Sequence, residues 1–489
     1  MFNEQEIKNL IDKSYQQAVD LLKSNNLRLA ELLLEQAIKI TNDDKIVELL
    51  AITKYQVNKF EEAISLYLTL PPSADIYNNL ALCYSKIENF ETSIEYSTAA
   101  LSYGYNLIFT NNLALTLRIK GDLNFAKIIL EQALSLDPNA ESYALLCGCY
   151  GQENNLPEAK ICALKGLEIN PNHAGLHVDL AYIHHLNGDL NEAWEEYEYR
   201  KICFPEIQQW LKRYHPDKEW KGQDLKNKRI VLYSEQGLGD AIQFIRYVPL
   251  LKEATIIFHG NLALKELLSP YYDEFVDIEQ EFSNYDYHAS LISLPFLTKK
   301  EGIETPYLKA NSVNYEKYQK ILKVGLCWAG SPYHPNDINR SCHLNKFEQI
   351  SKIEGLNLFS LQKDVRVRQY KNKQIVDFSE NAQNVKIIDI SFHMNNFKET
   401  AEIIAGLDLV ISVDTSIVHL AGAMGKETWV LIPYQPDWRW GINKNNSSWY
   451  PTLTLFRQKC PGNWDDVIDE IYECLKKKIA ANKAAISHA

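Results

Sequence analysis

Small residues recur at a nearly constant interval along the first two hundred residues, each within an apolar–polar pattern of helical period. Each one lies five residues after a polar or glycine turn, and together they are Ala30, Ala63, Ser93, Ala126, Ala159 and Ala193. The steps between them are 33, 30, 33, 33 and 34 residues. An interval of this length is typical of stacked helix–turn–helix units. The pattern therefore predicts an all-α solenoid over residues 1–200.

Other residue types recur at fixed offsets within the units. A leucine or phenylalanine follows each turn, at Leu27, Phe60, Phe90, Leu123, Leu156 and Leu190. An apolar residue precedes four of the small residues by thirteen positions, at Leu80, Leu113, Leu146 and Leu180. Pro138 and Pro171 fall where one helix pair ends and the next begins. These features resemble tetratricopeptide repeats, with the first two units degenerate.

The resemblance implies a concave groove that binds an extended peptide or protein segment, because single units bury their apolar faces only by stacking. Four asparagines recur on the first helices of two successive units: Asn78, Asn79, Asn111 and Asn112. They have two interpretations. They form a ladder that hydrogen-bonds the backbone of a ligand, or they are solvated helix surface.

After Arg200 the repeat pattern stops. Residues 201–228 mix proline, tryptophan and charged residues, and we interpret them as a docking linker that Trp210 and Trp220 pack onto the region that follows. Beyond the linker, short β-rich apolar runs alternate with helical stretches. Such alternation predicts parallel sheets covered by helices.

The apolar runs fall into two sets. The first set is "RIVLYS", "ATIIFHG", "EFVDIE" and "YHASLISL"; the second is "KVGLCWAGS", "NLFSLQK", "VKIIDIS", "LDLVISVD" and "TWVLIP". We predict two Rossmann-like lobes of α/β type, residues 229–312 and 313–489, with a final amphipathic helix on the second. Two such lobes bind ligands at the carboxyl ends of their strands, across a cleft.

The turn "EQGLGD" after the first strand does not match a dinucleotide fingerprint. Ile242 replaces the third glycine, and the second strand ends without an acid for a ribose hydroxyl. Gly237 and Gly239 allow close approach of the backbone. Asp240 follows in the first helical turn, where the helix dipole favours a carboxylate. Asp240 is therefore either a helix cap or a general base.

Polar residues also follow strands of the second lobe. Gly330 and Ser331 form a turn that can expose backbone amides. Arg340 offers a forked donor for phosphate oxygens, or is an ordinary loop cation. Gln362 and Lys363 end the next strand at the same edge of the sheet.

The string "DTSIVHLAGAMG" lies at a strand–helix junction. Asp414, Thr415 and Ser416 form the junction, and His419 follows one helical turn later. The residue types suit a nucleophile with acid–base partners, but no G-x-S-x-G elbow is present. Hydroxyl side chains here cap free amides, and those amides attract phosphate. A phosphate clamp is the favoured interpretation, and a simple helix cap is the alternative.

Composition narrows the classes of partner. The formal net charge of −12 disfavours extended binding to nucleic acid or to an anionic membrane. No apolar stretch reaches the length of a membrane span. The nine cysteines are scattered without a C-x-x-C pair, which favours buried free thiols in a reducing compartment. We expect a cytoplasmic protein without nucleic-acid binding or membrane insertion.

Four segments together resemble the tetratricopeptide-linked bacterial glycosyltransferases. They are "SEQGLGDAIQFIRYVPLL", "GLCWAGSPYHPNDINRS", "FSLQK" and "DLVISVDTSIVHLAGAMGKETWVLIPYQPDWRW". The catalytic part is similar to the heptosyltransferase family of GT-B enzymes, and more distantly to protein O-GlcNAc transferases and flagellin glycosyltransferases. The resemblance covers nearly the whole chain.

The resemblance implies a nucleotide-sugar donor held mainly by the second lobe. Asp240 matches the acid placed as the base, and Arg340 and Lys363 would neutralise phosphate charge. Four residues would contact the diphosphate or its ribose side: Asp414, Thr415, Ser416 and His419. Five more complete the expected donor site: Gly237, Gly239, Gly330, Ser331 and Gln362. Ser416 stands where heptosyltransferases usually have glycine, and those enzymes lack repeats, so neither a heptose donor nor a lipopolysaccharide acceptor is implied.

The resemblance and the residues agree on the chemistry. Glycosyl transfer needs a base for the acceptor hydroxyl and positive charge for the leaving nucleotide. The chain has no D-x-D motif of the metal-dependent transferase fold, so we expect inverting transfer without metal or cofactor. Our leading hypothesis is a transferase that modifies a protein Ser or Thr hydroxyl delivered by the repeats. The alternatives are transfer to a surface-glycan or lipid-linked saccharide, and a non-catalytic interaction scaffold.

Overall fold

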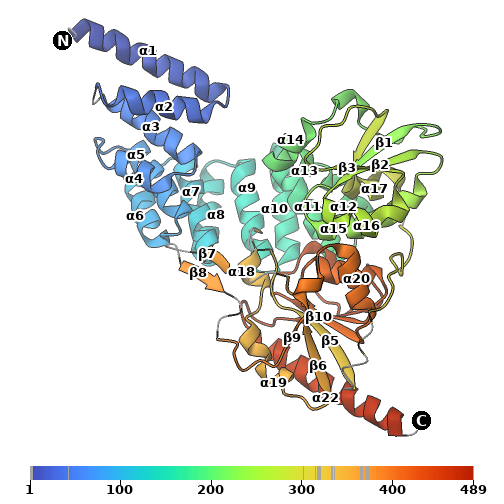
Figure 1. Cartoon of the computed structure of the whole chain (residues 1–489). Helices are drawn as coiled ribbons and strands as arrows, with labels where there is room; N and C mark the ends of the chain where they lie inside the picture. Colours follow the sequence, from blue (N-terminus) through green and yellow to red (C-terminus); the bar gives the residue numbers. More distant parts are fainter. Residues whose placement is uncertain are drawn as a thin grey trace. The chain divides into compact units, whose positions relative to one another are not determined.

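The computed structural model describes residues 4–487 apart from residues 42, 301, 314, 316–320, 332–333, 335, 364–366, 371–373, 378 and 380. Contacts divide the chain into two compact units (Figure 1). The first unit ends at His173 and the second begins at Ala174. Of the helices that the structure describes, none combines the length and the apolarity that a membrane crossing needs.

The first unit consists of helices that pack in sequence order. They are α1 (Glu4–Lys23), α2 (Leu27–Ala37), α3 (Asp44–Gln56), α4 (Phe60–Tyr67), α5 (Ala74–Lys86), α6 (Phe90–Leu101), α7 (Leu107–Lys120), α8 (Leu123–Leu136), α9 (Ala140–Gln152) and α10 (Leu156–Ile169). The second helix of each pair begins at the predicted leucine or phenylalanine. The predicted helical solenoid is confirmed.

The turn before each second helix explains the choice of residue there. All six turn residues have a left-handed φ between 57° and 97°, and they are Asn25, Asn58, Glu88, Gly121, Asn154 and Gly188. Glycine and asparagine adopt this conformation at the lowest cost, so Glu88 is the exception. The small residue five positions later is fully buried in every pair. Its short side chain lets the two helices approach closely.

The recurring asparagines bond within the solenoid. Asn112 Nδ2 donates to Asn78 Oδ1 at 2.9 Å, which joins α7 to α5. Ser142 Oγ donates to Asn111 Oδ1 at 2.8 Å, which joins α9 to α7. Asn78 and Asn111 are buried. Asn78 and Asn111 therefore help to pack neighbouring first helices together. They do not form a ladder that is open to the backbone of a ligand.

The second unit begins with the last helix pair and the linker. Their elements are α11 (Ala174–Asn187), α12 (Leu190–Tyr197), α13 (Arg200–Cys203), α14 (Pro205–Leu211) and the 3₁₀ turn η1 (Pro216–Lys218). Trp194 of α12 belongs to the hydrophobic core of the lobes. Trp210 packs beside the core formed by Tyr214 and Tyr233, and Trp220 is buried. The last pair and the linker are thus built into the α/β unit.

The first lobe holds a parallel sheet in the order β3-β2-β1-β4. Its strands are β1 (Arg229–Tyr233), β2 (Thr255–Gly260), β3 (Glu274–Asp277) and β4 (Tyr287–Ser290). The helical segments are α15 (Leu238–Phe244), η2 (Ile245–Leu250), η3 (Leu262–Leu264), α16 (Lys265–Leu268), η4 (Ser269–Tyr271), η5 (Leu291–Ser293) and α17 (Leu294–Thr298). All four predicted strands are present.

The second lobe holds a parallel sheet in the order β12-β11-β10-β5-β6-β9. Its strands are β5 (Leu322–Cys327), β6 (Leu356–Ser360), β9 (Ile388–Asp389), β10 (Leu409–Val413), β11 (Thr428–Ile432) and β12 (Leu453–Arg457). A separate antiparallel pair is β7 (Val367–Tyr370) with β8 (Gln374–Asp377). The sequence did not predict β12 or this pair.

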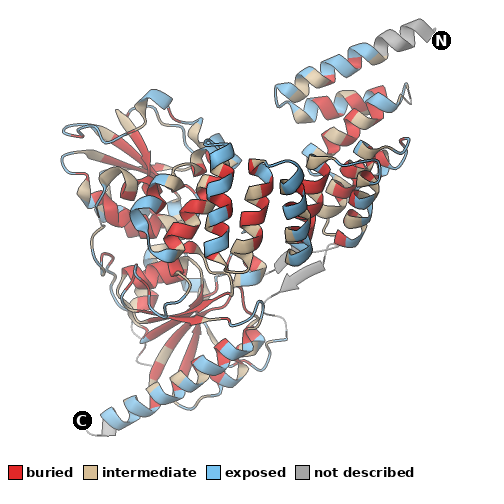
Figure 2. Ribbon diagram, turned by 180° about the vertical axis from the view of Figure 1, so that it is seen from behind, coloured by how far each residue is buried: buried red, intermediate tan, exposed pale blue. Residues whose placement is uncertain are grey.

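Strands β5, β6, β10 and β11 of the second lobe are almost wholly buried between its helices (Figure 2). The helical segments are α18 (Asp337–Arg340), η6 (Leu344–Phe347), α19 (Glu348–Ser351), η7 (Ser391–His393), α20 (Phe397–Ala405), α21 (Ser416–Ala423), η8 (Trp438–Trp440) and α22 (Asp465–Ser487). Val467, Ile471 and Leu475 of the final helix pack into the core of this lobe.

Both sheets reverse their winding beside their first strand. In the first lobe β1 lies between β2 and β4, and in the second β5 lies between β6 and β10. This is the doubly wound α/β arrangement, in which ligands bind at the carboxyl ends of the strands where the winding reverses. The turns that follow β1, β5 and β10 carry most of the candidate residues, so the topology puts them at the expected edges.

Candidate functional site

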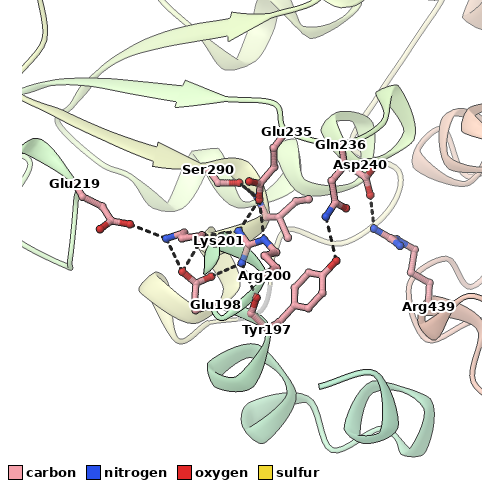
Figure 3. Close-up of polar contacts among 12 residues, drawn as sticks. Tyr197, Glu198, Arg200, Lys201, Glu219, Glu235, Gln236, Asp240, Ser290 and Arg439 are labelled. Carbon is pink, nitrogen blue, oxygen red and sulfur yellow. Dashed lines mark hydrogen bonds and ion pairs between the residues drawn. The ribbon is translucent and has the colours of Figure 1, made fainter. Parts of the chain in front are cut away.

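Asp240 joins the two lobes. It lies in the first turn of α15, where its Oδ2 accepts a hydrogen bond from the amide of Gly237 at 2.8 Å. Its Oδ1 forms an ion pair with the guanidinium of Arg439 from η8 in the other lobe (Figure 3). Burial raises the pKa of Asp240, although Arg439 and the Gly237 amide act in the opposite direction. Asp240 is therefore both a helix cap and a partly buried carboxylate beside a cation.

Arg439 has a partner for each of its three nitrogens. Its Nε donates to Gln243 Oε1 at 2.6 Å, and its Nη1 donates to Asp437 Oδ1 at 2.9 Å. Its Nη2 bonds Asp240. The guanidinium also lies over the ring of Trp438, 3.9 Å from the centroid. This cation is held by two carboxylates and an aromatic face.

The junction after β10 is a helix N-terminus, as predicted. Thr415 caps α21, because its Oγ1 accepts a hydrogen bond from the amide of Ile417 at 3.3 Å. The hydroxyls of Thr415 and Ser412 also lie 3.1 Å apart. Ser416 is the first residue of the helix. Thr415 is therefore a helix cap. Ser416 lies at the start of the helix, on the side that packs against α15.

His419 packs beneath that helix start. Its Nδ1 lies 3.0 Å from the hydroxyl of Tyr450, and its ring stacks with Trp440 at a centroid distance of 5.7 Å. Burial, with further contributions from nearby arginines that include Arg439, lowers the pKa of His419 well below its usual range. The imidazole is neutral at physiological pH and is not a source of positive charge for a phosphate.

Gly239 lies where α15 packs against α21. A Cβ on Gly239 would lie 2.7 Å from His419 Cδ2 and 3.4 Å from Ser416 Cα. A Cβ on Gly237 would meet only the end of the Asp240 side chain, at 3.1 Å, and the backbone of Gly239, at 4.0 Å. Gly239 is therefore required for packing of the two lobes.

The variant Gly239→Ala is expected to lower the free energy of unfolding by about 1–3 kcal/mol, since His419 is fixed by Tyr450 and must shift. Urea denaturation followed by tryptophan fluorescence measures the change. The matched control is Gly237→Ala, which should cost clearly less. Equal losses in the two variants would contradict the packing role of Gly239.

Arg340 lies against the turn that follows β5. A Cβ on Gly330 would lie 2.5 Å from its Nη2, so a side chain there would displace the guanidinium. Arg340 Nε donates to Asp337 Oδ1 at 3.4 Å. Ser341 Oγ donates to the same oxygen at 3.1 Å and accepts from the Gly330 amide at 2.9 Å. The glycine, the arginine and the buried Asp337 form one packed group.

Two residues after β6 differ in their surroundings. Gln362 is buried, and its Oε1 accepts from the amide of Ala329 at 3.1 Å and from the thiol of Cys327 at 3.5 Å. It therefore joins the ends of β5 and β6. Lys363 and Ser331 are exposed. The structure gives Gln362 a role in holding the sheet edge.

Asp414 completes the group of charges at the lobe junction. It is half-buried. Burial and then the nearby carboxylate of Asp437 raise its pKa to about 6, while Arg340 and Arg439 act in the opposite direction. The charges near the ends of β1, β5 and β10 therefore form one group. It contains two arginines, Arg340 and Arg439, and three carboxylates, Asp240, Asp414 and Asp437. Clustered charges in which carboxylates such as Asp240 and Asp414 have raised pKa values are characteristic of functional sites.

Arg246 in η2 is a buried residue that the sequence did not single out. Its Nη1 donates to the carbonyl of Trp449 at 3.1 Å, and its guanidinium lies 4.4 Å and 5.0 Å from the ring centroids of Tyr307 and Tyr450. It acts electrostatically on His419. A single charged residue, an arginine, within the largely apolar run "AIQFIRYVPLL" was the available signal.

Comparison with known proteins identifies the solenoid. Models of the tetratricopeptide repeat match residues 74–103, 111–139 and 162–195. Protein FlbA of Caulobacter vibrioides is 23% identical over 466 residues, which cover 84% of this chain and 74% of FlbA.

Two solved structures are similar to part of the chain. A thermophilic tetratricopeptide protein of Thermus thermophilus is 22% identical with a TM-score of 0.31, over 35% of this chain and 97% of its own. The pilF protein of Pseudomonas aeruginosa is 17% identical with a TM-score of 0.34, over 42% of this chain and 99% of its own. By the matched repeat models, the chain carries tetratricopeptide repeats, modules that commonly bind peptides or proteins.

Proposed function

We propose that the second unit is a glycosyltransferase of GT-B type, which moves a sugar from a nucleotide-sugar donor to a Ser or Thr hydroxyl of a protein. The observation that carries the proposal is the pair formed by Asp240 and Arg439 across the two lobes. Glycosyl transfer needs a base at the acceptor and positive charge at the leaving group. This pair puts a carboxylate of one lobe beside a cation of the other, at the ends of parallel strands.

In the proposed step Asp240 takes the proton of the acceptor hydroxyl. The hydroxyl oxygen bonds to the anomeric carbon, and the bond from that carbon to the diphosphate oxygen breaks. Its electron pair leaves on the nucleoside diphosphate, and this single displacement inverts the anomeric configuration. The raised pKa of Asp240 favours proton capture. Arg340 and Arg439 stabilise the charge on the diphosphate, the role that a divalent cation fills in metal-dependent transferases.

The donor is proposed to lie at the ends of β5 and β10. The helix start at Ser416 supplies backbone amides, and helix N-termini attract phosphate. Asp414 follows β10 directly and offers a carboxylate to a ribose hydroxyl. The protein acceptor is supported by the repeats, since such modules commonly bind peptides. A cytoplasmic location is supported by the nine cysteines, none of which forms a disulfide in the described structure.

A panel of nucleotide sugars tests the donor site through the melting temperature of the full chain. We expect one class of donor to raise the melting temperature of the wild type by several degrees. In Arg340→Ala, measured against its own unliganded value, most of that increase should be lost. Lys346→Ala is the matched control, because Lys346 pairs with Asp465 in the same lobe and should keep the full increase.

The same panel tests one alternative, and a transfer assay with a labelled donor tests the other. Tetratricopeptide repeats on their own suit a non-catalytic interaction scaffold, and in that case no nucleotide sugar stabilises the chain. Transfer to a surface-glycan or lipid-linked saccharide predicts a stabilising donor, but labelled sugar then appears on saccharide and none on protein. A donor that stabilises both variants equally would remove Arg340 from the site.

A further inference from the structure

Arg200, directly after the last repeat helix, is fully buried, and its partners lie mainly in the first lobe. It makes five hydrogen bonds with its five N–H donors (Figure 3). Nε and Nη2 donate to Glu235 Oε1 at 2.8 and 2.6 Å, and Nη2 also donates to Ser293 Oγ at 2.8 Å. Nη1 donates to the carbonyl of Tyr197 and to Glu198 Oε1. A buried charge satisfied this fully has one fixed position.

Glu235 lies in the turn that leads from β1 to Asp240. It is buried, and the oxygen that accepts from Arg200 also accepts from Ser290 Oγ of β4 at 2.6 Å. The next residue, Gln236, has a left-handed φ of 62°. A glutamine rarely adopts this conformation unless its surroundings impose it. Gln236 Nε2 donates to the hydroxyl of Tyr197 at 3.3 Å. Two successive residues of the turn are thus bonded to the segment that ends the last repeat.

The last repeat also supports the other member of the Asp240–Arg439 pair. His185 of α11 is buried and stacks on Trp438 with ring centroids 4.2 Å apart. Trp438 in turn lies under the guanidinium of Arg439. Burial lowers the pKa of His185 to about 3, so its ring is neutral. It can therefore stack on Trp438 without electrostatic repulsion from Arg439.

We propose that Arg200 and Glu235 are positioning residues, which hold the turn carrying Asp240, and that the last repeat pair is therefore a working part of the catalytic unit. The inference rests on the proposed function for its catalytic meaning. It gives the end of the solenoid a second role besides binding a partner. The helix pair α11–α12 contacts both the turn before the base and the aromatic ring beneath the arginine.

The experiment uses full-length Arg200→Lys and Glu235→Gln. Arg200→Lys keeps the positive charge but loses the forked set of donors, and Glu235→Gln keeps an accepting oxygen but loses the negative charge that pairs with Arg200. We expect kcat to fall about 10- to 100-fold, since small misplacement of a reacting group has effects of this size, with the donor KM unchanged. Amide hydrogen exchange in residues 234–241 should rise at the same time. Tyr197→Phe, which removes one hydroxyl, should give a smaller rise and keeps the test available if the first two variants fold poorly.

Lys201→Met is the matched control. Lys201 is adjacent to Arg200 and pairs with Glu198 and Glu219 at 2.7 Å each, but it does not bond the turn. It should leave both kcat and the exchange of residues 234–241 unchanged. Unchanged exchange in the Arg200 and Glu235 variants, or an equal rise in Lys201→Met, would overturn the inference. If the wild type transfers no sugar but the rise in exchange is selective, the proposed function fails and the holding role of Arg200 stands.

Discussion

Replacing Asp240 with asparagine is expected to reduce sugar transfer by about 10²- to 10⁴-fold, the range that general-base catalysis contributes. Asparagine has nearly the same shape but cannot take the proton of the acceptor hydroxyl. Donor binding should persist, because Arg340 and Arg439, the cations proposed to bind the diphosphate, remain in place. Single-turnover transfer from the stabilising nucleotide sugar measures the chemical step, and the shift in melting temperature measures donor binding.

The matched control is Asp437→Asn. Asp437 bonds the same guanidinium of Arg439, at 2.9 Å, so this variant disturbs the cation to a similar degree without touching the base. Its transfer rate should fall far less than that of Asp240→Asn. Equal losses in both variants would mean that Asp240 acts only by holding Arg439.

The pH profile gives a second test of the base. A base acts in its ionised form, so kcat/KM should fall as the pH drops through the pKa of Asp240. Burial raises that pKa above its usual range, which moves the fall to higher pH than for an exposed aspartate. Asp414, with a pKa of about 6, titrates in a neighbouring range. A fall that persists in Asp240→Asn and disappears in Asp414→Asn would assign it to the donor side.

The solenoid could be predicted from sequence because its rules are local. Each second helix starts within three residues of a turn residue in the left-handed conformation, and the small residue follows five positions after that turn. Glu88 shows the limit of residue identity, because it adopts the same conformation as Asn58 and Gly121 without being glycine or asparagine. The constant interval predicted this turn where the residue type alone would not.

The strands were predictable where an apolar run stands alone between turns. β12, Leu453–Arg457, lies at the edge of the second sheet beside β11 and follows a segment rich in tryptophan. That segment, with Trp438, Trp440 and Trp449, holds no apolar run that stands alone between turns, and the strand at its end was not predicted. Its pairing with β11 determines its conformation, and the pattern of hydrophobic and polar residues within the segment does not indicate that pairing.

The sequence predicted where the site lies, but not which residues in it pair with one another. The ends of parallel strands meet at one edge, so Asp240, Gly330 and Asp414 were expected near one another. Which cation faces Asp240 depends on contacts between residues 199 positions apart. The sequence singled out Arg340 and Lys363 as cations and missed Arg439, which is the one that pairs with Asp240. Gln362 was expected at the donor, whereas the structure shows it bonding Ala329. Partners of this kind follow from tertiary packing and leave no periodic signal.

Replacing Arg439 with methionine is expected to lower the free energy of unfolding of the second unit by about 3–5 kcal/mol, because it leaves buried partners without their cation. Asp240, Asp437 and Gln243 all lose a hydrogen bond, and the two carboxylates are left facing each other. All nine tryptophans lie between Trp194 and Trp464, in the second unit, so urea denaturation followed by their fluorescence reports on that unit alone.

Arg457→Met is the matched control for the loss of a large cationic side chain. Arg457 donates to the carbonyls of Lys444 and Gly441, at 2.9 and 3.0 Å, and to no carboxylate in the described part of the chain. Its removal should cost clearly less than the removal of Arg439. The double variant Asp240→Asn with Arg439→Met should lose less than the sum of the single losses, with a coupling of about 0.5–3 kcal/mol. If the losses in free energy of unfolding were strictly additive, the Asp240–Arg439 ion pair would not help to hold the two lobes together. The lobes would then be joined by the packing at Gly239 and His419, and the ion pair would contribute only to the chemistry.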